Sequence, residues 1–326
     1  MKAIDPFDLP HQEARSLLER GAPLFMPVNP VEYHGPHLSL HNDALISRGI
    51  ASDLHARLFP EQPLLYARDL EVGVEPCPGP GTRASPFLAV ASAVREATRA
   101  AVELGARKIV FVTFHGAPLH AHALDEGVSR AEELGARAVA PLTPVLERMV
   151  ELDDPSPLAP ACAFIEDAAL RAEALAGLQL DFHAGFFETS LALHYAPESV
   201  SDIRHALPPC PRPEADPALI AASRAARLVG KTVLARELAF AALGQGWNNL
   251  RPFPGYTGRP SLASKEAGAV FVDVLMSVME PVVRAALFEG RRQPTPLMSW
   301  LRSVTLDGRI QTSKVALADV LAVAGV

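Results

Sequence analysis

Residues 85–113 decide the fold class of this chain, because an amphipathic segment there is followed at once by a short apolar run. Apolar side chains recur at alternating spacings of three and four residues, at Phe87, Val90, Val94, Ala97, Ala101 and Leu104. That period predicts a helix, and Gly105 stands where the helix would end. The run KIVFVT at 108–113 is typical of a strand that is buried on both faces of a sheet. A helix that leads directly into such a strand is typical of α/β proteins.

The same alternation recurs along the chain and predicts an α/β fold with a mostly parallel sheet covered by helices on both sides. Further helices are predicted at 11–21, 43–59, 119–136, 217–243 and 264–289, and further strands at 22–28, 137–144 and 178–181. We expect a single domain over residues 1–290. Residues 291–326 are expected to form a C-terminal extension that packs on the domain or on a neighbouring subunit.

Charge and hydrophobicity narrow the classes of partner. The chain has a net charge of -7, and 49% of its residues are hydrophobic and 21% charged. These values are typical of a globular protein and offer no basic surface for nucleic acid or an anionic membrane. The apolar region at 269–288 is interrupted by residues that do not suit a membrane span, namely Asp273, Glu280, Pro281 and Arg284.

The cysteines indicate the compartment. Cys77, Cys162 and Cys210 are far apart in the sequence and form no CxxC pair. This spacing argues against a disulfide framework and against a thiolate zinc site. We therefore expect a cytoplasmic protein in which each cysteine is a small buried or loop residue.

One stretch near the amino end, PVNPVEYHGPHLSLHND at 27–43, is dense in residue types that bind metals. Glu32 and His34 are two positions apart, so in an extended segment both side chains leave the same face. Asp43 stands where the next predicted helix should begin. Carboxylates and imidazoles suit Zn²⁺ or Mn²⁺ when no thiolate is available. Taken alone the stretch is equally compatible with a structural role, because Glu-x-His is a common spacing.

Two other predicted strand ends carry similar residues. His115 follows the strand KIVFVT, and His183 and Glu188 follow the predicted strand LQLD. Ligand sites in open α/β sheets collect just outside the carboxyl ends of the strands, so the three stretches are expected to converge. Singly, each has a structural alternative: a hydrogen-bonded histidine at a strand end, or a carboxylate near a helix N-terminus.

Together, the stretches VEYHGPHLSLHND, FHGA, DFHAGFFETS and GYTGRPSLASKEAG resemble the ordered signature stretches of the creatininase (creatinine amidohydrolase) family, over about residues 20–280. The resemblance implies a three-layer αβα fold and a two-metal amidohydrolase site. Glu32, Asp43 and His115 would hold one ion, and His34, Asp43 and Glu188 the other, with Asp43 as the bridge. The implied cofactors are two divalent ions per chain, Zn²⁺ and/or Mn²⁺, with Fe²⁺ as a third candidate.

The resemblance also implies a reaction. A water held by the two ions, its pKa lowered to about 7, would attack a carbonyl carbon. His183 would handle the proton near the leaving nitrogen, and His37 would either support a ligand or fix the loop. The substrate would be a small-molecule amide, and the protein a homo-oligomer, with a hexamer as the expected form.

One stretch departs from the family pattern, because TFHGAP replaces the usual Asn-Gly-His-Gly-Gly-Asn. Members that hydrolyse creatinine carry glutamate two residues after the histidine and line the substrate with tryptophans. Here Ala117 holds that position, and the chain's tryptophans are Trp247 and Trp300. We therefore expect a substrate other than creatinine.

The expected reaction is cleavage of a non-peptide C–N bond in a small cyclic or linear amide, such as a lactam or formamide. Two alternatives stay open at this point. One is a peptidase of the mycofactocin-maturation type within the same family. The other is a metal-bound scaffold or binding protein without catalysis, because the altered stretch TFHGAP could have cost the chain its turnover.

Overall fold

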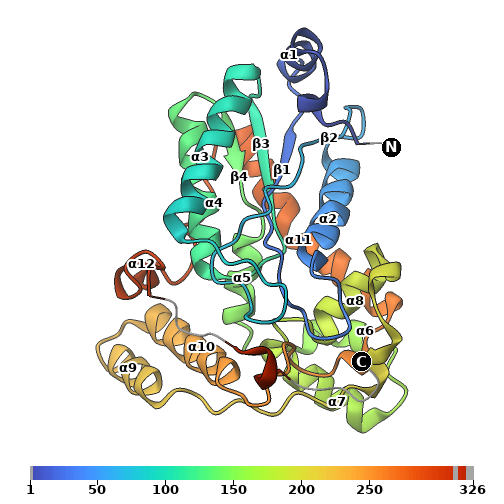
Figure 1. Cartoon of the computed structure of the whole chain (residues 1–326), viewed down its shortest axis with the longest axis vertical. Helices are drawn as coiled ribbons and strands as arrows, with labels where there is room; N and C mark the ends of the chain where they lie inside the picture. The colour runs from blue at the N-terminus through green and yellow to red at the C-terminus, as the bar shows by residue number, and fades with distance from the viewer. Residues whose placement is uncertain (1–2, 311–314, 321–326) are drawn as a thin grey trace.

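A four-stranded, all-parallel sheet lies at the centre of the computed structural model, which describes residues 3–310 and 315–320 (Figure 1). Its order is β2-β1-β3-β4, and the strands are β1 (Leu24–Pro27), β2 (Leu65–Tyr66), β3 (Lys108–Val112) and β4 (Arg137–Val139). Parallel neighbours require crossover connections, and helices supply them here. The predicted strands at 22–28, 108–113 and 137–144 therefore all exist, although the last ends after three residues.

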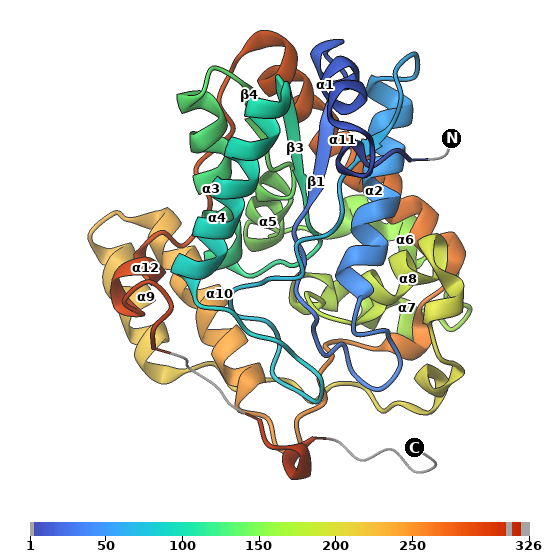
Figure 2. The same cartoon turned by 45° about the horizontal axis from the view of Figure 1, so that its top comes forward.

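Helices cover both faces of the sheet, as Figures 1 and 2 show. Alternate residues of β3 point to opposite faces. Val110 and Val112 pack with α2 (Asn42–Leu58) and α11 (Lys265–Glu289), whereas Ile109 and Phe111 pack with α3 (Phe87–Leu104) and α4 (Pro118–Glu133). A strand that is apolar on both faces is thus explained by two helical layers. The predicted α/β fold is confirmed.

The remaining elements are shorter or lie away from the sheet. The other helices are α1 (His11–Glu19), α5 (Thr143–Val150), α6 (Ala159–Cys162), α7 (Ala168–Gly177), α8 (Phe186–Tyr195), α9 (Pro217–Leu228), α10 (Thr232–Asn248) and α12 (Trp300–Val304). Short 3-10 turns are η1 (Pro6–Asp8), η2 (Ser156–Leu158), η3 (Leu178–Leu180), η4 (Pro197–Ser199), η5 (Asp202–Ala206), η6 (Pro260–Leu262) and η7 (Leu317–Asp319). Over residues 3–310 and 315–320, no helix combines the length and the low polarity that crossing a membrane demands.

The strand predicted at 178–181 is wrong, because this segment forms the 3-10 turn η3. The backbone N–H of Asp181 bonds to the carbonyl of Leu178, and the Asp181 carboxylate accepts hydrogen bonds from the N–H groups of Phe186 and Phe187. The segment thus satisfies its polar groups locally and serves as the entry to α8. A short apolar pair does not distinguish a strand from such a turn.

The single helix predicted at 217–243 is also wrong, since two helices, α9 and α10, occupy this region. Gly230 lies between them with φ of 76°, a left-handed conformation that glycine adopts without a steric penalty. Asp216 caps the first helix by accepting from the N–H groups of Ala218 and Leu219. When two amphipathic helices are separated by only a few residues, their combined apolar pattern resembles that of one longer helix.

The described part of the predicted extension contacts α4 and α10 of the same chain. Arg292 pairs with Asp125 and Glu132, which lie on α4. The backbone N–H of Met298 and the indole N–H of Trp300 both donate to the Glu237 carboxylate of α10. The division of the chain at residue 290 into a domain and an extension stays a prediction.

Candidate metal centre

Five candidate ligands meet at the carboxyl ends of β1 and β3, which are neighbours in the sheet. The loop after β1 carries Glu32 and His34, and Asp43 lies in the first turn of α2. His115 follows β3 directly, and Glu188 lies in the first turn of α8. All five side chains are buried. The structure therefore brings together every residue that the sequence singled out as a ligand.

Glu32, Asp43 and His115 form the first group, whose ligand atoms all lie within 4.8 Å of one another. The Nδ1 of His115 lies 2.7 Å from Oε2 of Glu32 and 3.9 Å from Oδ2 of Asp43. The other ring nitrogen of His115 donates to the carbonyl of Val74 at 2.8 Å. That bond orients the ring and turns Nδ1 toward the two carboxylates, so Nδ1 is the nitrogen left for a cation.

His34 organises the second group. Its Nε2 lies 3.4 Å from Oδ1 of Asp43 and 3.2 Å from Oε1 of Glu188. Its Nδ1 donates to the Glu32 carbonyl at 3.0 Å, so Nε2 is the nitrogen left for a cation. Asp43 thus turns one carboxylate oxygen toward each histidine. That position between the two groups is the one a bridging ligand requires.

Two buried carboxylate oxygens in this cluster lack hydrogen-bond partners, as expected for residues that bind cations. Among the described residues, Oε2 of Glu32 and Oδ2 of Asp43 are buried without a hydrogen-bond partner. Their close approach to His115 lacks the alignment of a hydrogen bond. Buried oxygens left in this state are costly unless a cation or a proton satisfies them. The donor set of carboxylates and imidazoles fits Zn²⁺ or Mn²⁺.

Mutual attraction shifts the pKa values of the cluster. Burial acts to raise the pKa of Glu32, but the charges of His115 and His34 outweigh it and hold that pKa well below its usual range. Burial acts to lower the pKa of His115, and Glu32 outweighs it and raises that pKa to about 9. The pKa of His34 is likewise raised well above its usual value, by Glu188 and Asp43 against burial. Burial raises the pKa of Asp43 to about 7.

Metal binding is expected to release protons. Since His34 and His115 have raised pKa values, both hold a second proton at pH 7 in the metal-free protein and must lose it when a cation takes the lone pair. Affinity for Mn²⁺ or Zn²⁺ should therefore increase from pH 6 to about pH 9. Calorimetric titration at pH 7 in two buffers of different ionisation enthalpy measures the protons released. An affinity that falls over this range would contradict the proposed ligands.

His183 lies against the cluster. Its ring stacks on that of His34, with centroids 4.4 Å apart, and its Nε2 donates to the carbonyl of Tyr33 at 3.0 Å. Nδ1 is left facing the site, 3.8 Å from Oε1 of Glu32. Burial and the charge of His34 lower the pKa of His183, so the ring is neutral and can accept a proton at Nδ1. One ring nitrogen of His183 also lies close enough to His34 and Glu188 to serve as a ligand.

The structure adds residues that the sequence patterns did not identify. Asn42 donates to Oε1 of Glu188 at 2.8 Å, and the backbone N–H of Cys77 donates to Oε1 of Glu32 at 2.6 Å. Burial and Glu32 raise the pKa of the Cys77 thiol, which disfavours a thiolate. Glu75 adopts a φ of 54°, unusual for a residue with a side chain, and lines the same cavity. No motif marks these positions; a strained turn has no sequence signature when glycine is absent.

The other histidines near the signature stretches have structural partners. His37 contacts the Thr189 hydroxyl at 2.9 Å, which ties the loop to α8 as expected. His120 and His122 donate to the carbonyls of Val28 and Leu297, at 3.1 and 3.0 Å. Within the described residues, the groups of His, Cys, Asp and Glu that could hold an ion all belong to the cluster around Glu32 and His34.

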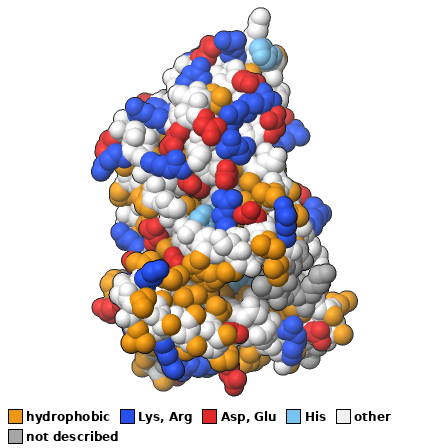
Figure 3. All heavy atoms as spheres, turned by 90° about the vertical axis from the view of Figure 1, so that its left-hand side faces the viewer, with side chains coloured by type: hydrophobic (Ala, Val, Ile, Leu, Met, Phe, Trp, Pro, Cys, Tyr) orange, Lys and Arg blue, Asp and Glu red, His pale blue; other side chains and the backbone are white. Residues whose placement is uncertain are grey.

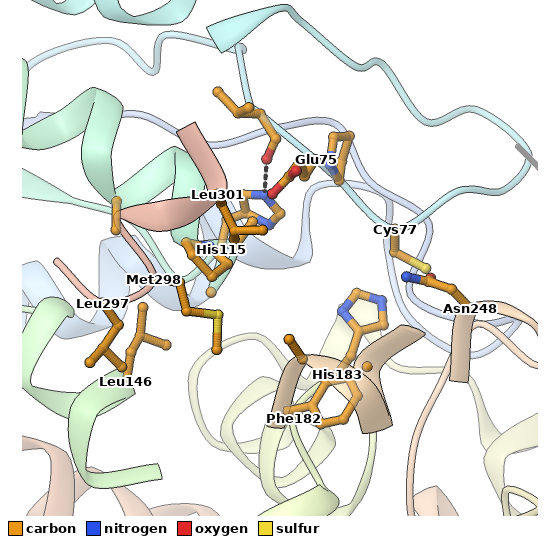
Figure 4. Close-up of a pocket in the computed structure, with 18 of the residues that line it drawn as sticks. Glu75, Cys77, His115, Leu146, Phe182, His183, Asn248, Leu297, Met298 and Leu301 are labelled. Atoms are coloured by element: carbon orange, nitrogen blue, oxygen red, sulfur yellow. Dashed lines mark hydrogen bonds between the residues drawn. The ribbon is translucent and has the colours of Figure 1, made fainter. Parts of the chain in front are cut away.

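A cavity of about 730 Å³ opens over this cluster (Figure 4). Figure 4 shows His115 and His183 on different sides of this cavity, with Leu146, Leu297, Met298 and Leu301 toward one side and Cys77 and Asn248 toward another. The C-terminal segment therefore contributes to the wall of the site. The two tryptophans, Trp247 and Trp300, also line the cavity, which their positions in the sequence did not reveal.

Comparison with known proteins identifies relatives. The family model of creatininase, described as creatinine amidohydrolase, matches residues 8–282. A manganese form of creatininase shares 19% identity, with 87% of this chain and 98% of that chain covered and a TM-score of 0.53. A mutant creatininase of the Zn-Zn type gives the same values.

A third structure, a putative creatinine amidohydrolase from Bacteroides fragilis, shares 18% identity with the same coverage and TM-score. At these identities the structural likeness shows the fold alone. No curated protein matches the sequence.

Proposed function

The chain belongs to the creatininase family, and from that premise we propose that it is a two-metal amidohydrolase that cleaves a non-peptide C–N bond of a small amide. Membership implies a metal-dependent amidohydrolase. The observation that carries the finer proposal is the position of Asp43, whose two carboxylate oxygens face His34 and His115 on opposite sides. A single carboxylate shared by two ligand groups is the arrangement that a two-metal site needs.

The ligand roles follow from the contacts. Glu32, Asp43 and His115 would hold one ion, and His34, Asp43 and Glu188 the other. When bound, two such ions acidify a water and supply a hydroxide nucleophile near neutral pH. Asn42 fixes Glu188, and Val74 fixes the tautomer of His115, so the residues that would hold the ions are held in turn.

His183 would handle the proton in this reaction. Amide hydrolysis breaks the C–N bond, places the water oxygen on the acyl carbon and passes a proton to the leaving nitrogen. The neutral Nδ1 of His183 faces Glu32 at the edge of the metal cluster and can carry that proton. Its hydrogen bond to the Tyr33 carbonyl keeps the ring in place during the transfer.

A substrate panel tests the proposed function. Protein loaded with Mn²⁺ or Zn²⁺ should hydrolyse at least one of a series of lactams, formamides, ureas and linear amides, and a chelator should abolish the activity. Release of ammonia or amine provides the measurement. Cleavage confined to short peptides would favour the peptidase alternative. Two bound ions without turnover on any compound would favour the non-catalytic scaffold.

We do not expect creatinine to be the substrate. Ala117, at the position of the family glutamate, forms the N-cap of α4 and lines the cavity. Its methyl group offers no charge or hydrogen bond to a polar ring. We therefore propose a substrate other than creatinine, although both tryptophans of the chain are available to contact it.

A homo-oligomer is proposed on the family relationship. Hydrophobic side chains gather on the lower part of the face shown in Figure 3, which carries α9, α10 and α12. Leu228 and Val229 at the end of α9 are 88% and 71% exposed, which is unusual for such residues. Sedimentation of the purified protein should show an assembly, with a hexamer as the expected form.

A further inference from the structure

The cavity over the metal cluster has an apolar end beside His115. A Cβ added at Gly116, the next residue, would stand 3.3 Å from Cδ2 of Leu146, so that leucine lies directly over the His115 loop. The carbonyl of Leu297 accepts a hydrogen bond from His122 on α4, the helix that follows this loop. Figure 4 shows Leu146, Leu297, Met298 and Leu301 grouped at this end. Four aliphatic side chains from two distant segments thus form one wall.

The opposite end belongs to His183 and mixes polar with aromatic side chains, because Phe182 lies beside His183 in Figure 4 and the Trp247 ring centroid is 5.4 Å from that of His183. Cys77, Glu32 and His183 place their polar atoms within 4.8 Å of one another, and Asn248 lies beside them in Figure 4. Glu32 separates the two ends, since its Oε2 faces His115 and its Oε1 faces His183. A substrate carbonyl at the metal cluster would therefore have one substituent toward the aliphatic wall and the other toward His183.

The stretch that departs from the family pattern belongs to the apolar end. Phe114, Ala117 and Pro118 line the cavity, and Phe114 packs against Phe187 with ring centroids 5.9 Å apart. Each replaces a polar or flexible position of the usual pattern. Glu75 lies beside His115 in Figure 4.

Hydrogen bonds and a cation–π contact hold the 297–301 segment of this wall in place. Glu237 is buried on α10 and accepts hydrogen bonds from the Met298 backbone and the Trp300 indole, at 2.9 and 3.0 Å. Arg302 lies over the ring of Phe87 at 4.6 Å from its centroid. These contacts fix the segment on both sides of Leu301. The aliphatic side chains therefore present a defined surface to a ligand.

From these observations, and resting on the amidohydrolase function proposed above, we propose that the substrate is an amide whose acyl part carries an extended apolar group. The acyl group would lie along the aliphatic wall, and the leaving nitrogen would face His183. The volume supports this, because about 730 Å³ falls in the range of roughly 300–1,000 Å³ that encloses drug-sized ligands. An amide of a few atoms would leave most of this space unfilled.

Two series of amides test the proposal. In the first, the acyl chain of a primary amide grows from acetamide to octanamide; in the second, acetamide carries growing alkyl groups on nitrogen. With metal-loaded protein, kcat/KM should rise about three- to fourfold per methylene along the acyl series, until the wall is covered. Values that stay flat along the acyl series, or that rise only along the nitrogen series, would overturn the proposal.

The affinity for amides, measured apart from turnover, distinguishes the apolar wall from the proposed amidohydrolase function. Both tryptophans line the cavity, so their emission reports occupancy with or without turnover. Affinity that increases with acyl length while no amide is hydrolysed would support the apolar wall and contradict the amidohydrolase function. Hydrolysis with equal affinity and equal kcat/KM for all acyl lengths would support the function and overturn the wall.

Variants locate the effect. Leu301→Asp places a charge in the wall and should lower the ratio of kcat/KM for hexanamide to that for acetamide by at least about tenfold. Leu306→Asp is the matched control, since Leu306 lies on the same segment, is 58% exposed and does not line the cavity. If Leu301→Asp fails to fold, Leu146→Ala serves, and should shift the best substrate to a longer chain. An unchanged chain-length profile in a folded variant would overturn the proposal.

Discussion

Replacing Asp43 with alanine is expected to reduce the metal content of the purified protein from about two ions per chain to about one or none. Asp43 is the carboxylate that faces both His34 and His115, so its removal takes a ligand from each ion. Each ion would keep only two of its proposed protein ligands. Metal analysis of dialysed protein, with the wild type alongside, measures the loss.

Asp53→Ala is the control for this experiment. Asp53 lies on the same helix, α2, but accepts a hydrogen bond from the Tyr195 hydroxyl, away from the cluster. Its replacement should leave the metal content at the wild-type level. Equal metal content in the wild type and in Asp43→Ala would show that the bridging assignment is wrong.

Replacing His183 with alanine is expected to lower turnover by about 10²–10⁴-fold while both ions stay bound. The ring contributes a neutral nitrogen at the edge of the cluster, and alanine cannot carry a proton from it to the leaving nitrogen. The rate on the best amide of the panel and the metal content of the same sample are measured together. His205→Ala, at an exposed position, should change neither.

The metal content decides between two roles for His183. The ring lies close enough to His34 and Glu188 to be a fourth ligand of the second group, beside His34, Asp43 and Glu188. Loss of an ion from the His183→Ala variant would show that His183 is a metal ligand and would argue against its role in proton transfer. Retention of both ions together with a normal rate would remove it from both roles.

Local patterns in the sequence predicted most of the fold. The spacing of apolar residues gave the helices at 87–104 and 265–289 nearly to their ends, because an amphipathic period reports directly which face is buried. The failures were at 178–181 and 217–243. There the deciding interactions were a carboxylate that caps the next helix and a glycine in a left-handed conformation, and neither alters the apolar pattern.

The candidate ligands could be read from sequence because their chemistry is restrictive. Few residue types bind Zn²⁺ or Mn²⁺, and these five stand in stretches that resemble one family. The site roles of Cys77, Asn42 and Glu75 were not predicted, because these residues contribute a backbone N–H, a side-chain amide and a strained turn. Such groups take part in a site only through the residues that they contact in the folded protein.

The family, the α/β class and the candidate ligands could therefore be predicted from the sequence. Each depends on the spacing of apolar residues or on the residue types in short stretches. The direction of each lone pair, the placement of Asp43 between two histidines and the two ends of the cavity required the tertiary structure. Leu146 and Leu301 are separated by more than a hundred residues, yet Figure 4 shows them at one wall. Packing brings such segments together through contacts, here at Glu237 and His122, that no short stretch of sequence encodes.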